Sequence, residues 1–277
     1  MTRVFLHAGF HKTGTKSLQH FLRQNGAIIR PSADFVLPED LRDITRLGFW
    51  YQDLPDPQLL AQMQTALQRV FARCELTQPG QNRRKLIISA ENLLGRLPDG
   101  ETDRLYPAAT DLLRTAVQSL SVLPPPVDIV VYLSLRRQDD WVRSLHGHLA
   151  MKQRRIRLTD DLAQFSARLD REPLRDVAAR IVVAFSPRQT VMRDITELAS
   201  APFGIAQPIV DFLDLPPDQR ARLQPLQHLH RSADPRLVGD LIALNRSPFD
   251  ADALAAAKNA RIAGNVLAGT DMKGNLR

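Results

Sequence analysis

Short apolar runs alternate with segments of helical periodicity along this chain. Four runs rich in apolar and β-branched residues predict strands, which we place near residues 4–7, 85–90, 127–133 and 181–185. Apolar residues at helical spacing predict helices near residues 15–24, 57–74, 103–119, 188–199, 205–212, 234–244 and 251–262. Strands separated by helices are typical of an α/β fold, in which helices flank a parallel sheet on both faces. With no internal repeat, we predict a single domain over residues 1–277, with a loose C-terminal tail from about residue 265.

A loop rich in Gly, Lys and Thr joins the first predicted strand to the first predicted helix. Gly9 and Gly14 let the backbone pass close to an anion, and the amides of the turn and of the helix N-terminus point toward it. The loop side chains that offer charge or hydroxyl donors are Lys12, Thr13, Thr15, Lys16 and Ser17. The loop therefore predicts a site for a phosphorylated ligand.

The spacing of this loop indicates which phosphate ligand it would bind. The nucleotide triphosphatase loop has Gly, four residues, then Gly-Lys-Ser/Thr, and here Thr15 comes between Gly14 and Lys16. The loop resembles instead the 5′-phosphosulfate loop of the sulfotransferases that use 3′-phosphoadenosine 5′-phosphosulfate (PAPS), usually Pro-Lys-Ser/Thr-Gly-Thr-Thr. The residues that match are Lys12-Thr13-Gly14-Thr15, while His11 replaces the proline and Lys16 the second threonine.

A second stretch carries the same resemblance. In these sulfotransferases a strand ends in an arginine, and a serine eight residues later on the next helix helps it to bind the 3′-phosphate. Arg136 and Ser144 follow the apolar run 127–133 with that spacing, and an arginine can fork onto a phosphate. The resemblance implies a three-layer sandwich like that of the P-loop nucleotide triphosphatases. It also implies PAPS as cofactor, 3′,5′-adenosine bisphosphate as product, and no metal.

Sulfuryl transfer needs a base for the acceptor proton and positive charge for the departing nucleotide. The resemblance gives the second task to Lys12. For the first task we favour Glu91, because it follows a predicted buried strand, where open α/β sheets hold their ligands, and because several carbohydrate sulfotransferases use a glutamate. Glu91 could also be a first-turn acid of the following helix. The histidines that rival it as base are His7, His11, His146 and His148, of which His7 could be a satisfied core residue.

The formal net charge of +7 and a pI near 10.0 favour acidic partners. A doubly phosphorylated nucleotide is one, and an anionic acceptor such as a glycan is another. Much of the basic excess lies in residues 152–157, either a solvated face or an electrostatic lip for acceptor or cofactor. Aromatic residues make up only 6% and no nucleic-acid motif is present, so we do not expect nucleic acid as a partner.

Cysteine content and hydropathy indicate the cellular compartment that we expect for this chain. Cys74 is the only cysteine, so neither an intrachain disulfide nor a cysteine-based metal site can form, which agrees with a reducing compartment. No run of 18 apolar residues occurs, and the phosphate loop begins close to Met1. We therefore expect no membrane anchor or signal peptide, and a cytoplasmic location.

Two alternatives remain open at this stage. A P-loop kinase or nucleotide hydrolase would share the sheet and the loop, but it needs Mg²⁺ and usually an aspartate at another strand end, where this chain has Glu91. A sulfotransferase-like protein that binds nucleotide without catalysis is the other. The C-terminal Arg-Lys-Gly signature of the small-molecule enzymes is reduced here to Met272-Lys273-Gly274-Asn275. The identity of the acceptor also stays open: it carries a hydroxyl or an amine, and a carbohydrate is one candidate. The oligomeric state stays open too.

Overall fold

The chain divides into two compact units. The computed structural model describes residues 1–74, 76, 85–101, 104–152, 157–169, 172–186, 189–226 and 233–274, and only the backbone of 266–274. The first unit takes in Met1–Pro98, Arg104–Arg137 and Glu172–His230. The second takes in Asp99–Asp103, Gln138–Arg171 and Arg231–Arg277. That both units make up one sulfotransferase-like domain stays a prediction.

A five-stranded, all-parallel sheet forms the centre of the first unit. Its strands are β1 (Thr2–His7), β2 (Ala33–Val36), β3 (Lys85–Ser89), β4 (Val127–Leu135) and β5 (Thr190–Asp194), in the order β2-β3-β1-β4-β5. Val4 of β1 pairs with Leu86 on one side and Ile129 on the other. Because all strands run the same way, their carboxyl ends share one edge. The strand order reverses between β1 and β4, which is where open α/β sheets bind ligands.

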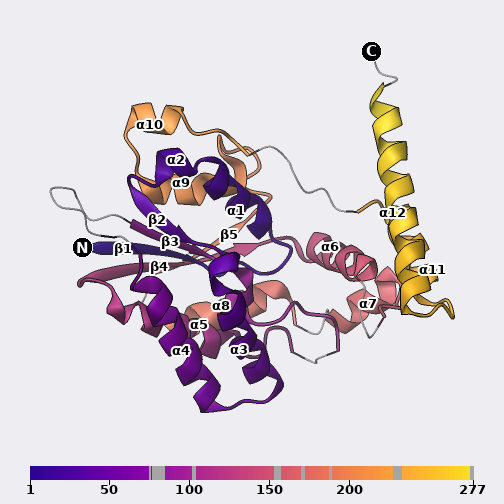
Figure 1. Cartoon of the computed structure of the whole chain (residues 1–277), viewed down its shortest axis with the longest axis horizontal. Helices are drawn as coiled ribbons and strands as arrows, with labels where there is room; N and C mark the ends of the chain where they lie inside the picture. The colour runs from indigo at the N-terminus through magenta and orange to yellow at the C-terminus, as the bar shows by residue number, and fades with distance from the viewer. Residues whose placement is uncertain are drawn as a thin grey trace. The chain divides into compact units, whose positions relative to one another are not determined.

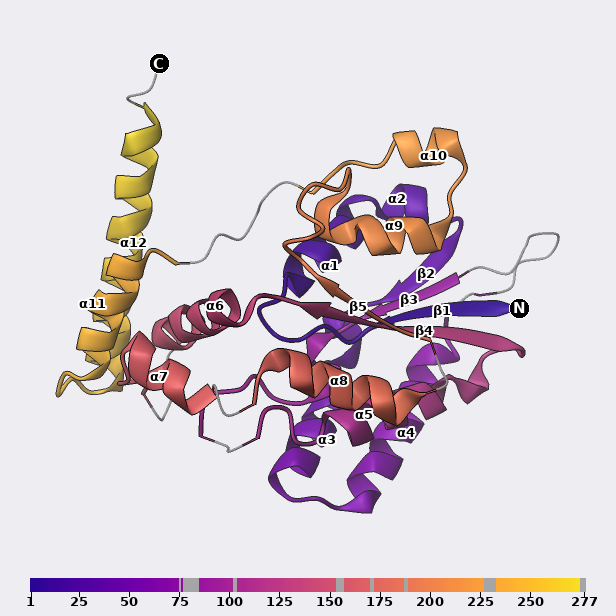
Figure 2. The ribbon, with the colours of Figure 1, turned by 180° about the vertical axis from the view of Figure 1, so that it is seen from behind.

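Helices cover both faces of this sheet (Figures 1 and 2). One face carries α1 (Thr15–Gln24), α2 (Gly26–Ile29), α9 (Gln207–Leu213) and α10 (Pro217–Ala221). The other carries α3 (Arg42–Asp53), α4 (Pro57–Phe71), α5 (Ala109–Ser119) and α8 (Leu174–Phe185). Short 3₁₀ turns are η1 (Pro38–Leu41), η2 (Glu91–Leu94), η3 (Leu120–Val122) and η4 (Gly204–Ala206). The predicted three-layer α/β fold is confirmed.

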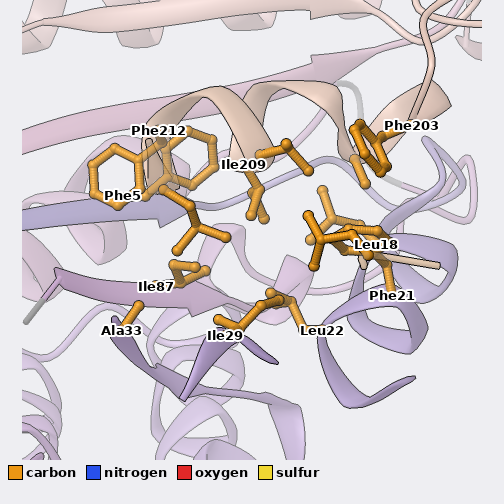
Figure 3. Packing of buried hydrophobic residues seen from close by; sticks show 14 of the residues in the cluster. Phe5, Leu18, Phe21, Leu22, Ile29, Ala33, Ile87, Phe203, Ile209 and Phe212 are labelled. Carbon is orange, nitrogen blue, oxygen red and sulfur yellow. The ribbon is translucent and has the colours of Figure 1, made fainter. Parts of the chain in front are cut away.

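Packing against the sheet fixes the position of α1. Leu18, Phe21 and Leu22 recur at helical spacing and lie buried against the apolar side chains of β1, β3 and α9 (Figure 3). Phe5 of β1 stands 5.2 Å, centroid to centroid, from the ring of Phe212 in α9. Each such side chain contributes about 1.5–3 kcal/mol by leaving water. The N-terminus of α1 is thereby held beside the carboxyl end of β1.

The second unit is helical in its described residues. It contains α6 (Gln138–Met151), α7 (Leu162–Leu169), α11 (Pro235–Asn245) and α12 (Ala251–Gly274). The buried Lys258 of α12 donates from Nζ to the carbonyls of Ala150 and Lys152, both at 2.9 Å, and so caps the C-terminal end of α6. In the basic stretch 152–157, Arg157 donates to the carbonyls of Ser247 and Phe249. Residues 153–156 of that stretch lie outside the described residues.

Two predicted elements are wrong. The run Ile181–Phe185 is the end of helix α8, because its buried positions Leu174, Val177, Ala178, Ile181 and Phe185 follow a helical period while Val183 is 76% exposed. The strand that lies next to β4 in the sheet is β5, which falls within the range 188–199 where the sequence predicted a helix. The range expected to form a loose tail lies largely in α12, which continues to Gly274.

Among the described residues, none of the helices combines the length and the apolar character that a membrane span needs.

Candidate functional site

The loop between β1 and α1 has a backbone shaped for close approach. Lys12 has φ 67° and Gly14 has φ 87°, both in the left-handed region. The amides of Ser17 and Leu18 are the first to bond into α1, donating to the carbonyl of Gly14 at 3.0 and 3.2 Å. A Cβ at Gly14 would lie 2.8 Å from Cδ1 of Ile205. Glycine is therefore favoured at position 14 chiefly by its backbone angle, since the Ile205 side chain can shift.

Thr15, the first residue of α1, carries a hydroxyl that has no hydrogen-bond partner among the described residues. The residue is 4% exposed, and Oγ1 itself is buried. Buried polar atoms are normally paired, so an unpaired hydroxyl at a helix N-terminus fits an anionic oxygen as its missing partner. Lys16 beside it is exposed, and Lys12 and Ser17 are half-buried. The residues present thus fit a phosphate or phosphosulfate group.

Thr13 has a different place in this loop. It is 1% exposed, its hydroxyl donates to the carbonyl of Phe10 at 2.5 Å, and the same oxygen lies 2.8 Å from Oγ of Ser134 in β4. Its side chain therefore shapes the loop from within. A phosphate contact from Thr13 stays a prediction.

A buried hydrogen-bond chain runs beneath the loop from β3 to β4. His7 places Nδ1 2.9 Å from Oγ of Ser89 and Nε2 3.1 Å from Oγ of Ser134. Because the hydroxyl of Thr13 donates to Phe10, Ser134 must donate to Thr13, and His7 must then donate from Nε2 to Ser134. Burial lowers the pKa of His7 to about 3, so its ring is neutral. His7 is the satisfied core residue that the sequence allowed, and its lone pair at Nδ1 accepts from Ser89.

Gly9 makes room for this chain. A Cβ at position 9 would lie against Nε2 of His7 and 2.5 Å from Oγ of Ser134. Any larger residue would displace the groups that hold the loop.

Glu91, the candidate base, stands at the carboxyl end of β3 as the first residue of η2. It is half-buried, and its Oε2 accepts from Nε2 of Gln19 in α1 at 3.0 Å. The negative charge of Glu91 raises the pKa of His11, and the positive charge of Lys12 lowers it. Both predicted catalytic residues therefore influence the protonation of the same imidazole. The structure therefore brings Lys12 and Glu91 to one end of the sheet. The first-turn position also keeps open the structural role for Glu91.

His11 interacts electrostatically with both of these residues, and each of its ring nitrogens lies within hydrogen-bonding distance of a side chain. Nδ1 is 3.1 Å from the hydroxyl of Tyr106, and Nε2 is 2.9 Å from Oδ1 of Asn92. Burial lowers the pKa of His11, against the opposing effects of the Glu91 charge and the Asn92 hydrogen bond. A neutral ring whose lone pair already accepts from a tyrosine is a poor rival for the role of base.

Arg136 follows β4 directly and contacts the loop. Its Nη1 donates to the carbonyl of Lys12 at 3.4 Å, so one residue of the predicted 3′-phosphate site contacts the predicted 5′-phosphosulfate loop. Ser144, the predicted partner of Arg136, is half-buried on α6 of the second unit, and the pairing stays a prediction. His146 and His148 lie on the same helix, where Nε2 of His146 is 2.9 Å from the carbonyl oxygen of Asp160.

Several residues of this site were not found from the sequence, namely Gln19, Asn92, Tyr106 and Ser134. Ser89 and Ser134 offered one signal, because each is a polar residue within an apolar strand run and so needs a buried partner. Tyr106 offered none, since the sequence predicted it within a helix and the structure gives it φ 49° before α5.

We compared the chain with known proteins. No protein-family model, no curated protein and no solved structure gives a significant match to it.

Proposed function

We propose that this chain is a sulfotransferase that moves a sulfuryl group from PAPS to a hydroxyl or amine acceptor. The observation that carries the proposal is the loop 9–17, where the left-handed Lys12 and Gly14 precede a helix N-terminus with an unpaired, buried Thr15 hydroxyl. The contact of Arg136 with this loop supports a second phosphate site beside the first.

The residues would divide the work as follows. PAPS supplies the activated sulfuryl group when bound. The N-terminus of α1, with Thr15, Lys16 and Ser17, would hold the 5′-phosphosulfate, and Arg136 with Ser144 would hold the 3′-phosphate. Lys12 would stabilise the negative charge that develops as the nucleotide leaves.

Glu91 would take the proton of the acceptor. Its place beside His11 and Lys12 supports this role, and the engagement of both nitrogens of His11 supports Glu91 over that histidine. A carboxylate that accepts one hydrogen bond, from Gln19, keeps lone pairs for an acceptor proton. The acceptor is a glycan or another small molecule, and the formal net charge of +7 favours an acidic one.

A transfer assay with labelled PAPS and pooled hydroxyl and amine acceptors tests the proposal. Glu91→Gln keeps the hydrogen bond with Gln19 within reach but removes basicity, so transfer should fall by about a hundredfold or more while nucleotide binding survives. Glu39→Gln, in an exposed pair with Arg23, is the matched control and should leave transfer unchanged. Near-normal turnover in Glu91→Gln, with loss of turnover in His146→Ala or His148→Ala, would assign the base to histidine.

Two other outcomes would replace the proposal. Nucleotide binding without transfer to any acceptor would favour the non-catalytic nucleotide-binding protein. Hydrolysis of ATP, or phosphoryl transfer from it, with Mg²⁺ would favour the P-loop kinase or hydrolase.

A further inference from the structure

The side chain of His11 joins three separate segments of the first unit. It belongs to the loop after β1, its Nε2 lies 2.9 Å from Oδ1 of Asn92 in η2, and its Nδ1 lies 3.1 Å from the hydroxyl of Tyr106 before α5. The backbone amide of His11 also donates to that hydroxyl, at 3.0 Å. Both partners are far from His11 in sequence, so the contacts exist only in the folded chain.

Hydrogen positions in this cluster follow from donor and acceptor accounting. Asn92 presents an oxygen, so Nε2 of His11 must carry the hydrogen and Nδ1 must accept. The Tyr106 hydroxyl, which burial keeps protonated by raising the pKa of Tyr106, is then the donor to Nδ1. The Tyr106 hydroxyl, the Asn92 oxygen and both ring nitrogens are then hydrogen-bonded, and only one tautomer of His11 satisfies these contacts.

The hydrogen bond between His11 and Asn92 links two residues that are next in sequence to the proposed catalytic residues. His11 is adjacent to Lys12, and Asn92 is adjacent to Glu91. We propose that His11 is a positioning residue, whose Nε2–H bond to Asn92 fixes the turn that carries Glu91 relative to the loop that carries Lys12. Its importance for catalysis rests on the function proposed above, but the fixing of the turn does not.

Conservative variants at position 11 separate the two hydrogen bonds that the imidazole makes. Gln at position 11 places an amide nitrogen near the former Nε2 and can still donate to Asn92. Asn places an amide oxygen near the former Nδ1 and can still accept from Tyr106, but it does not reach Asn92. His11→Ala removes both bonds, and His20→Ala, at an exposed position of α1, controls for the loss of an imidazole.

Amide hydrogen exchange of η2 tests the positioning role without any activity. The amides of Leu93 and Gly95 donate to the carbonyls of Ala90 and Asn92, so their exchange reports opening of this turn. We expect exchange about tenfold faster in His11→Ala and His11→Asn, and near the wild-type rate in His11→Gln and His20→Ala. Asn92→Ala, which leaves the loop sequence intact, should show the same acceleration and carries the test if His11→Ala fails to fold.

Unchanged exchange in His11→Ala, or equal protection in the Asn and Gln variants, would overturn the proposal. In the transfer assay kcat should fall about tenfold in His11→Ala and recover in His11→Gln, while the Kd for 3′,5′-adenosine bisphosphate changes less than about threefold. If exchange responds as expected but the wild-type protein transfers no sulfuryl group, the positioning role stands and the proposed function fails. If the wild-type protein is active and exchange does not respond, the reverse holds.

Discussion

His7 and Ser134 are hydrogen-bonded between the central strand of the sheet, β1, and its neighbour β4. Nε2 of His7 in β1 lies 3.1 Å from Oγ of Ser134 in β4, and Ser134 is in turn hydrogen-bonded to Thr13 of the loop. Every hydroxyl in this chain has one hydrogen, so its direction is fixed from Ser89 to the carbonyl of Phe10. The loop that we propose to bind phosphate is therefore held from beneath by a neutral histidine.

We expect His7 to resist protonation far below the ordinary range. Its pKa is lowered from 6.5 to about 3 by burial, whereas the unfolded chain binds the proton near pH 6.5. Stability from this group is therefore fully present above pH 6.5 and is lost as the pH falls toward 3, by about 1.4 kcal/mol per pH unit. Urea unfolding between pH 7 and 4 and ring NMR of His7 measure this. A folded-state midpoint near pH 6.5 would contradict it.

Ser134→Ala should destabilise the protein more than an equally buried serine elsewhere. It leaves Nε2–H of His7 without an acceptor and Oγ1 of Thr13 without a donor, at a cost of about 1–3 kcal/mol. Ser119→Ala is the control, because its hydroxyl donates at 2.7 Å to the carbonyl of Thr115 within α5 and leaves no group unpaired, so we expect about 0.5 kcal/mol or less. Chemical unfolding at pH 7 compares the two. Equal losses would show that the chain beneath the loop is not a special feature.

Gly14→Ala should impair both stability and nucleotide binding. The left-handed angle of 87° costs about 1–2 kcal/mol for a residue with Cβ, and that Cβ would also meet Ile205. Gly204→Ala separates the two effects, because it has φ 53° but nothing within 4 Å of the added carbon. We expect a similar strain cost there with unchanged binding, and binding at least about tenfold weaker in Gly14→Ala. Calorimetric titration with 3′,5′-adenosine bisphosphate decides between them.

Arg136→Ala and Lys12→Ala should fail differently. Loss of a bidentate arginine–phosphate contact removes about 2–3 kcal/mol of uniform binding and should raise the KM for PAPS with little change in kcat. Lys12 would face the developing charge, so its loss should lower kcat as well. Arg3→Ala, in an exposed pair with Asp128 at the start of β1, should change neither constant. Steady-state kinetics that show the same defect in both site variants would contradict the assigned roles.

The central part of the fold could be predicted because its signals are local. β1, β3 and β4 are buried on both faces and appear as apolar runs, and α1 was predicted over the residues it occupies. The edge strands β2 and β5 are short and half-exposed, so their sequences carry polar residues and gave no strand signal. The run 181–185 misled because a five-residue apolar stretch is compatible with the buried end of a helix.

The site shows the same division. The loop from Gly9 to Ser17 and Arg136 were predicted from residue types and spacing, and the structure brings Lys12 and Arg136 into contact. The supports of the loop could not be found in this way, because they depend on contacts such as that of His11 with Tyr106, 95 positions away. No local pattern encodes the tertiary distance between such residues.

Isothermal titration calorimetry without metal tests the central claim most directly. The ligands are 3′,5′-adenosine bisphosphate, adenosine 5′-monophosphate and ATP, the last with and without Mg²⁺. The two phosphate sites that we propose, at residues 12–17 and at Arg136, predict that the bisphosphate binds more tightly than the other two ligands and needs no metal. Equal binding of the monophosphate would mean that the site at Arg136 is idle, and tighter binding of ATP with Mg²⁺ would mean that the loop serves a triphosphate. Either result would contradict the assignment as a PAPS-dependent sulfotransferase.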